Sequence, residues 1–226
     1  MISILEAAKE IQQFEKDSLT DRISSLEYEL AGGDSNTCQS TYPSLGITST
    51  LLESAITFKR TAGQINVLIH SIGILLALPK ILGNNEIIEY LSLGAGNTGR
   101  PFDLVTNQRI AEFKFIHWQG GAESIRQNSL FKDFFLLAEH ETPKQKYLYV
   151  LGTKYPLKFL RSGRSLESVM SRNNKLLADF QERYGSRFKK IGEYFEYRKS
   201  VVQLVDITEI VPQFGNETIT ENDVLE

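Results

Sequence analysis

The chain of 226 residues is long enough for one large domain, or for one domain with an appendage. Its 41% hydrophobic and 23% charged residues are ordinary for a soluble globular protein with a real core, and the formal net charge of −3 indicates no special partner. The single cysteine, Cys38, excludes an internal disulfide and a cysteine metal cluster, which favours a reducing, cytoplasmic location.

Charge is unevenly distributed along the chain. Residues 144–199 carry 14 Lys and Arg against 5 Asp and Glu, whereas residues 206–226 carry six acids and no base. Residues 1–33 carry seven acids against three bases. The basic segment can attract a polyanion despite the negative total, because the local field matters more than the sum. Taken alone, the pattern favours the alternative, a solvated pair of helix faces.

The N-terminal third of the chain predicts helices. Residues 3–30 have the spacing of one or two amphipathic helices and lack the basic region of a signal peptide, and residues 31–44 have the composition of a loop. Helices are expected at 48–59 and 62–82. The second is apolar on nearly all sides, so we expect it to be internal. Its most apolar run, 65–79, is too short to span a bilayer comfortably, and no membrane is expected.

The remainder alternates between strand and helix patterns. In chain order we expect strands at 87–93, 101–106 and 109–118, a helix at 122–140, a strand at 146–152, a helix at 165–184 and a final strand or pairing segment at 200–211. Asn107 and Gln108 suit a tight hairpin turn. The central order of helix, three strands, helix and strand predicts an α/β sandwich in which a meander is followed by a crossover helix.

The stretch "GAGNTG" at 94–99 fits the glycine pattern of a dinucleotide-binding turn. That turn needs a helix to begin inside the motif, so that free N–H groups meet the pyrophosphate. Strand alternation follows instead, and the acid expected about twenty residues later falls at Glu123, which opens a helix. The glycines therefore predict a connection between two antiparallel strands, where positive φ angles cost little.

Three charged residues follow this loop. Side chains two apart on a strand share a face, so Glu112 and Lys114 point the same way, while Phe113 points into apolar packing. With the hairpin turn at 107–108, Asp103 lies opposite residue 112, which places the two carboxylates roughly 5 Å apart at Cβ. Carboxylates this close repel, and a divalent metal would resolve the conflict with Lys114 as a third charged member.

These residues resemble the PD-(D/E)XK nuclease superfamily, the restriction-endonuclease-like fold. The match consists of Pro101-Phe102-Asp103, eight residues, and Glu112-Phe113-Lys114, on the second and third strands of an αβββαβ order spanning roughly residues 48–152. One departure is that Phe102 separates Pro101 from Asp103. Another is that helix 62–82 offers no acid, for which Glu53 or Glu89 is a candidate substitute.

The resemblance implies a site and a chemistry. Asp103, Glu112 and the backbone carbonyl of Phe113 would hold Mg²⁺, for which Mn²⁺ may substitute. The metal would polarise the scissile phosphate and activate a water molecule, while Lys114 would orient or help deprotonate that water and stabilise charge on phosphorus. Gln127 matches a loose form of the QxxxY element, with Phe131 in place of Tyr. The candidate nucleic-acid contacts are Gly96, Arg100, Arg126, Lys132, Arg161 and Arg164.

Each assignment has an alternative. Glu112 and Lys114 are also compatible with a solvent-facing charge ladder, and Gln127 with an ordinary exposed helix position. Trp118 and His117 would stack on a base or serve as hydrophobic anchors. The chain contains no G-x-S-x-G motif, and its histidines, including His70, have no ligand spacing, which argues against a serine hydrolase and a zinc enzyme.

The sequence therefore predicts a metal-dependent nuclease that hydrolyses DNA, with RNA not excluded, in an endonuclease of restriction or phage-defence type. We expect an N-terminal helical extension at 1–47, a nuclease-like domain at 48–212 and an acidic tail at 213–226. The extension would serve dimerisation or target recognition, in a homodimer or a larger defence complex. The alternative is a catalytically inactive module of this fold that binds nucleic acid or a protein partner.

Overall fold

The computed structural model describes residues 2–16, 18–94, 102–116, 118 and 124–216. The chain forms two compact units, residues 1–68 and 69–226. The boundary between them falls inside one long helix, α4 (Ser49–Ile81), whereas the sequence placed a domain boundary just before this helix.

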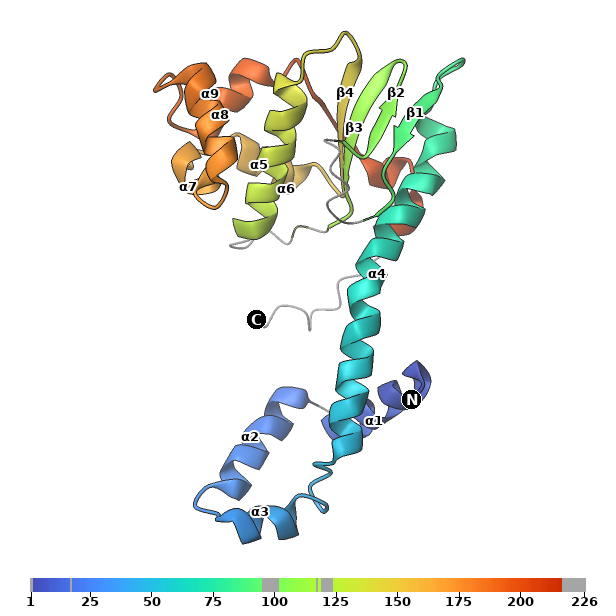
Figure 1. The fold of residues 1–226 in the computed structure, drawn as a ribbon, viewed down its shortest axis with the longest axis vertical. Coiled ribbons are helices and arrows are strands. Elements are labelled where there is room, and N and C mark those ends of the chain that lie inside the picture. The colour runs from blue at the N-terminus through green and yellow to red at the C-terminus, as the bar shows by residue number, and fades with distance from the viewer. Residues whose placement is uncertain (1, 17, 95–101, 117, 119–123, 217–226) are drawn as a thin grey trace. The chain divides into compact units, whose positions relative to one another are not determined.

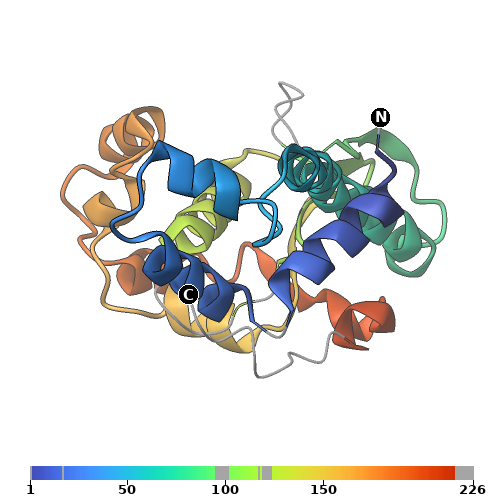
Figure 2. The same cartoon turned by 90° about the horizontal axis from the view of Figure 1, so that it is seen from below.

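The first unit is helical. Its helices are α1 (Ile4–Glu15), α2 (Leu19–Leu30), α3 (Ser35–Thr41) and the first part of α4, the blue and cyan segments of Figures 1 and 2. A side-chain oxygen caps each of the first three helices: Ser3 accepts from Glu6 N, Ser18 from Asp21 N and Asp34 from Thr37 N. These bonds satisfy backbone donors that have no partner inside the helix, which fixes where each helix begins.

Helix α4 corrects two expectations. The patterns at 48–59 and 62–82 form one continuous helix of 33 residues, with Pro79 in its last turn. The helix is also not internal, because only one of its faces is buried against the sheet of the second unit, through Ile74, Ala77 and Leu78. Its other apolar side chains stay exposed, among them Ile72 at 45% and Leu76 at 47%. An all-round apolar composition therefore does not make a helix internal.

By length and composition, α4 is long and apolar enough to cross a membrane, and it is the one helix in the described part of the chain of which this is true. The core helix of a soluble protein meets the same criteria. In α4 only 22% of the apolar window is buried, and Ile74, Ala77 and Leu78 near its C-terminal end belong to the core beneath the sheet.

The second unit is a mixed α/β structure whose described residues form a five-stranded sheet in the order β1-β2-β3-β4-β5. The strands are β1 (Ile88–Leu91), β2 (Leu104–Thr106), β3 (Arg109–Lys114), β4 (Gln145–Val150) and β5 (Gln203–Asp206). The first three strands are antiparallel neighbours, and β3, β4 and β5 run parallel. Helix α5 (Ser124–Glu139) forms the crossover from β3 to β4. The predicted meander, hairpin turn at 107–108 and crossover helix are confirmed.

Helices flank both faces of this sheet (Figure 1). One face packs on α5, and the core on that side continues through α6 (Lys154–Leu160), α7 (Leu166–Met170), α8 (Asn174–Tyr184) and α9 (Ile191–Arg198). The other face packs on α4 and on the short helices η1 (Ile207–Glu209) and η2 (Pro212–Asn216). The single helix expected at 165–184 is therefore two helices, α7 and α8. The strand expected at 200–211 is shortened to β5, because the chain turns into η1 after Asp206.

A buried ion pair fastens the β2–β3 turn. The Glu86 carboxylate, with none of its side chain exposed, accepts from Arg109 Nε at 2.5 Å and Nη2 at 2.7 Å. Thr106 Oγ1 at 2.6 Å and the Gly83 N–H at 2.8 Å complete its partners. The carboxylate is thus fully hydrogen-bonded, which offsets the cost of burying it. The pair lies at the start of β3, the opposite end of this strand from Glu112 and Lys114.

Candidate functional site

Asp103 lies immediately before β2. Its backbone N–H donates to Ala111 O at 3.1 Å, and the pairing of Leu104 with Ala111 places it opposite Glu112, as the hairpin register predicts. Strand β2 begins at Leu104, so its backbone does not accept a ladder hydrogen bond from the Phe113 N–H. The Asp103 side chain takes that place, since its Oδ2 accepts from Phe113 N at 3.0 Å. This bond fixes the carboxylate beside the end of β3.

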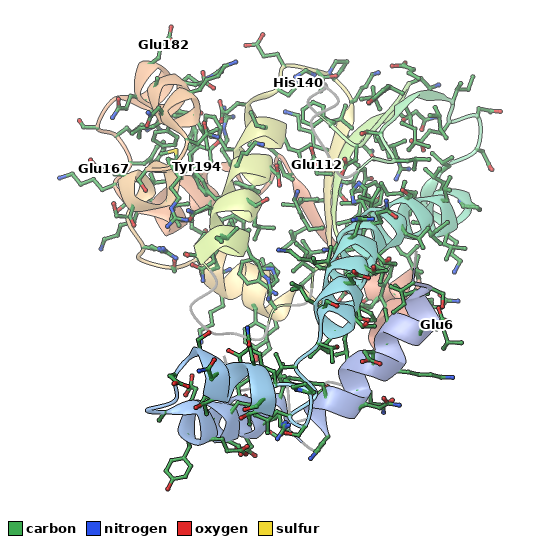
Figure 3. All side chains as sticks on the ribbon, turned by 60° about the horizontal axis from the view of Figure 1, so that its bottom comes forward. Glu6, Glu112, His140, Glu167, Glu182 and Tyr194 are labelled. Atoms are coloured by element: carbon green, nitrogen blue, oxygen red, sulfur yellow. The ribbon has the colours of Figure 1, made fainter. Side chains whose placement is uncertain are left out.

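Glu112 points to the side of the sheet that α5 covers, together with Ile110, while Ala111 and Phe113 face the α4 side (Figure 3). The strand register sets Glu112 opposite Asp103, and the two carboxyl groups lie close enough to shift each other's pKa. Glu112 is only 8% exposed, which rules out the alternative of a solvent-facing charge ladder. The close cross-strand pair of acids predicted from the sequence is present.

Lys114 ends β3 on the same face as Glu112. Its ammonium lies 2.7 Å from Oδ2 of Asp133, a buried residue in the middle of α5. Sequence reasoning missed Asp133. The available signal was an acid set among apolar positions, with Leu130 three residues before it and Leu137 four residues after it, on the buried face of an amphipathic helix. A buried acid needs a partner, and Lys114 is the partner.

His70 was the other omission. It projects from α4 on the opposite face of the sheet, and its Nε2 lies 3.5 Å from Asp103 Oδ1. Its ring packs edge-on against Phe115, with ring centroids 5.8 Å apart. The sequence gave no reason to choose it, because a lone histidine in an apolar helix has no ligand spacing. The apolar helix that offers no acid thus places an imidazole beside Asp103.

The four charged or titratable groups of β2, β3 and α5 shift one another's pKa. Burial and the neighbouring Asp133 and Asp103 carboxylates raise the pKa of Glu112 to about 10, which keeps it protonated at neutral pH. Burial would also raise the pKa of Asp103, but the nearby His70 imidazole, the neighbouring Glu112 carboxyl and the hydrogen bond from the Phe113 N–H outweigh it and lower that pKa below its usual value. Asp103 therefore holds the negative charge of the pair.

Lys114 and Asp133 are shifted as a buried ion pair. Burial by itself lowers the pKa of Lys114, but the Asp133 and Glu112 carboxyls outweigh burial and raise it. Burial raises the pKa of Asp133 despite the attraction of Lys114. The site thus gathers three carboxyl groups around one fixed ammonium, an excess of acid that a cation relieves.

The donors fit a small divalent cation. The Asp103 and Glu112 carboxyl groups lie opposite each other, and a strand residue directs its N–H and C=O to the same neighbouring strand. The Phe113 carbonyl therefore faces the Asp103 side, because its N–H bonds there. Carboxylate and carbonyl oxygens are the ligands that Mg²⁺ prefers. Among the described residues, no group of three His, Cys, Asp or Glu side chains is arranged to hold a metal, so two carboxylates and one backbone oxygen are the protein donors on offer.

The other catalytic candidates are not all beside this pair. Gln127, near the start of α5, accepts a hydrogen bond from Arg164 Nη1 and lines a separate cavity of about 280 Å³. Glu89 pairs with Lys144 at 2.5 Å, and Lys144 precedes β4 at the end of the sheet away from Lys114. Glu53 belongs to the first unit.

The candidate nucleic-acid contacts are scattered. Arg126 lies seven residues before Asp133, on the same stripe of α5, and so faces the site end of the sheet. Lys132 and Arg161 are exposed, and Arg164 is half-buried at the cavity with Gln127. Gly96 and Arg100 lie outside the described residues.

Comparison with known proteins adds no relative. No protein-family model matches the sequence, and neither curated proteins nor solved structures give a match. The resemblance to PD-(D/E)XK nucleases therefore stays a prediction, and function is inferred from the chemistry of the site.

Proposed function

We propose that the chain is a divalent-metal-dependent nuclease that hydrolyses DNA phosphodiester bonds, with a restriction-endonuclease-like arrangement of its second unit. The observation that carries the proposal is the placement of the Asp103 and Glu112 carboxyls opposite each other, with Glu112 on the strand that ends in the half-buried Lys114 paired with the buried Asp133. The order α4, β1, β2, β3, α5 and β4, with antiparallel β1–β3 and parallel β3–β4, supports it as the arrangement that the superfamily resemblance implies.

Asp103, Glu112 and the Phe113 carbonyl would hold Mg²⁺ or Mn²⁺. The bound cation supplies Lewis-acid polarisation of a phosphate oxygen and of a water molecule. Before a cation binds, the Asp103 carboxylate is already ionised and oriented, because the Phe113 N–H and His70 lie beside it. Glu112 has to release its proton when it becomes a ligand, since its pKa is raised to about 10 without a cation.

Lys114 acts as a fixed positive charge in this scheme. Its raised pKa keeps the ammonium protonated at neutral pH, so it stabilises negative charge that develops on the phosphoryl oxygens but cannot accept the proton of the attacking water. Asp133 positions the ammonium through the 2.7 Å contact. Of the two roles that the superfamily assigns to this lysine, the structure supports charge stabilisation.

The test is cleavage of a supercoiled plasmid by the full chain with Mg²⁺, with Mn²⁺ and with EDTA. We expect nicked or linear product with either metal and none with EDTA. Lys114→Met alone would leave Asp133 buried without its cation, so the informative variant is Lys114→Met combined with Asp133→Asn, which removes both charges. That double variant should fold and fail to cut. Full cutting by it would refute the mechanism.

Metal binding is tested separately by calorimetry. Asp103→Asn should weaken Mg²⁺ binding at least about tenfold, since it replaces a charged ligand with a neutral one. An unchanged affinity would remove Asp103 from the metal site. The runner-up function, an inactive module of this fold that binds nucleic acid or a protein, predicts DNA retention without any cleavage product in the plasmid assay.

We also propose a cellular location, a biological role and an assembly for this nuclease. A cytoplasmic endonuclease of restriction or phage-defence type, acting as a homodimer or in a larger complex, is the setting suggested by analogy with the superfamily and by the single cysteine. The choice of DNA over RNA is tested by repeating the cleavage assay with single- and double-stranded forms of each.

A further inference from the structure

The separate cavity that Gln127 lines combines aromatic rings with polar and charged side chains. It has a volume of about 280 Å³, and its lining includes Trp118, Gln127, Tyr155, Phe159 and Arg164. These residues come from the segment after β3, from α5, from α6 and from the loop after α6. The volume is at the small end of the range for ligand pockets, about 300–1,000 Å³, which suits a single nucleoside better than a larger ligand.

Aromatic rings form one part of this cavity. Trp118 packs against Phe159 with ring centroids 5.8 Å apart and planes tilted by 47°. Phe159 is only 5% exposed and belongs to the main core, so this part of the lining is held in place by the core. Tyr155 and Trp118 keep part of their surface exposed. Half-exposed rings fixed in a cavity are the surfaces on which unpaired bases stack.

Hydrogen-bond donors and positive charges form the other part. Arg164 Nη1 donates to Gln127 Oε1, which uses the amide oxygen and leaves the amide NH₂ as a donor. Arg164 has further guanidinium donors, and Lys158 on α6 adds a second cation to the lining. Rings beside two cations and an amide match a base joined to a phosphate, whereas a phosphate alone would leave the rings without a role.

Helix α5 connects the cavity with the proposed site, because Gln127 lines the cavity and Asp133 pairs with Lys114. Gln127 lies six residues before Asp133 on α5, a separation of about 9 Å along the helix axis. Nucleotides in a stacked strand are spaced at about 3.4 Å, so this corresponds to about three steps. A substrate strand that runs along α5 with a phosphate beside Lys114 would therefore reach the cavity about three nucleotides away.

The geometry points to a nucleotide subsite in this cavity, in which one unpaired base of the substrate strand stacks on Trp118 and Tyr155 while Arg164 and Lys158 bind its phosphate. This inference rests on the proposed nuclease function, and it narrows the class of substrate. It requires a strand with unpaired bases at or near the cleavage position.

The sole tryptophan of the chain makes the subsite directly observable. Fluorescence of Trp118 is measured in wild-type protein with EDTA, so that no metal-dependent cleavage occurs, during titration with a single-stranded pentanucleotide, a blunt duplex of the same sequence and inorganic phosphate. We expect quenching by the single strand, a weaker response to the duplex and none to phosphate.

Two variants and a charge-matched control locate the effect. Tyr155→Leu should weaken single-strand binding about 5- to 150-fold, the contribution of stacking one base. Arg164→Gln should weaken it as well, and because this side chain is half-exposed, the variant keeps the test valid if Tyr155→Leu fails to fold. Arg172→Gln removes the same charge from an exposed position outside the cavity and should keep the affinity within about twofold.

The outcomes separate the subsite from the nuclease. The subsite is refuted if Trp118 fluorescence does not change on addition of the oligonucleotide, or if both cavity variants bind the oligonucleotide as tightly as wild type does. If Mg²⁺-dependent cleavage is nevertheless present, the nuclease function stands. If phosphate quenches as strongly as the oligonucleotide, the cavity is an anion site and the subsite is refuted. If base-dependent quenching is lost in the variants but no cleavage occurs with any metal, the subsite stands and the nuclease is refuted.

Discussion

Glu112→Gln should remove a pH dependence from the stability of the metal-free protein. In the folded chain the pKa of Glu112 is raised to about 10, against 4.5 for the ordinary glutamate. A raised pKa means that the folded state keeps a proton which the unfolded chain releases. The stabilisation from this proton is complete below about pH 4.5 and is lost as the pH rises through the folded value.

The magnitude follows from linkage. Between the two pKa values, unfolding releases one proton from Glu112, so the free energy of unfolding falls by about 1.4 kcal/mol for each pH unit. From pH 6 to pH 8 this single group accounts for a loss of about 2.7 kcal/mol in wild type. Glutamine has the same shape and cannot titrate, so Glu112→Gln should lack this component of the slope.

Urea unfolding at pH 6, 7 and 8 in EDTA measures the effect, as the difference between wild type and Glu112→Gln at each pH. Glu182→Gln is the matched control, because Glu182 is exposed on α8 and should leave the slope of wild type unchanged (Figure 3). If the free energy of unfolding changes with pH in the same way in wild type and in Glu112→Gln, Glu112 is not a buried, protonated carboxyl. That result would also contradict the proposal that Asp103 and Glu112 form a metal site.

Three further predictions concern other parts of the second unit. Arg109→Met leaves the buried Glu86 carboxylate without its cation and should lower the free energy of unfolding in urea by about 3–5 kcal/mol. Adding Glu86→Leu should restore part of this loss, and a double variant no more stable than Arg109→Met alone would contradict the prediction. Gly192→Ala places a methyl group 2.9 Å from Arg161 O and should cost about 1–3 kcal/mol, whereas a melting temperature equal to that of wild type would show that the loop yields. Asp133→Asn removes the charge that contributes most to raising the pKa of Lys114, so the alkaline limb of the cleavage rate should move to lower pH, and an unmoved limb would separate Lys114 from catalysis.

Local patterns predicted the central part of the second unit because its contacts are short in sequence. The turn at 107–108 sets the register of β2 and β3, and that register alone brings Asp103 opposite Glu112. Period-two alternation then decides that Glu112 and Lys114 share a face. Local patterns wrongly predicted that α4 is internal, because the composition of a helix shows how apolar it is but not which elements cover it.

The tertiary structure decided the partners of these residues. Asp133 reaches Lys114 only because α5 crosses back over β3, and His70 reaches Asp103 only because α4 packs on the other face of the sheet. Such contacts depend on how helices lie on a sheet, and no spacing in the chain encodes them. The sequence by itself determined the αβββαβ order and the paired acids on adjacent strands. Packing decided the charge of those acids, since burial and a third carboxyl hold Glu112 protonated while His70 and the Phe113 N–H hold Asp103 ionised.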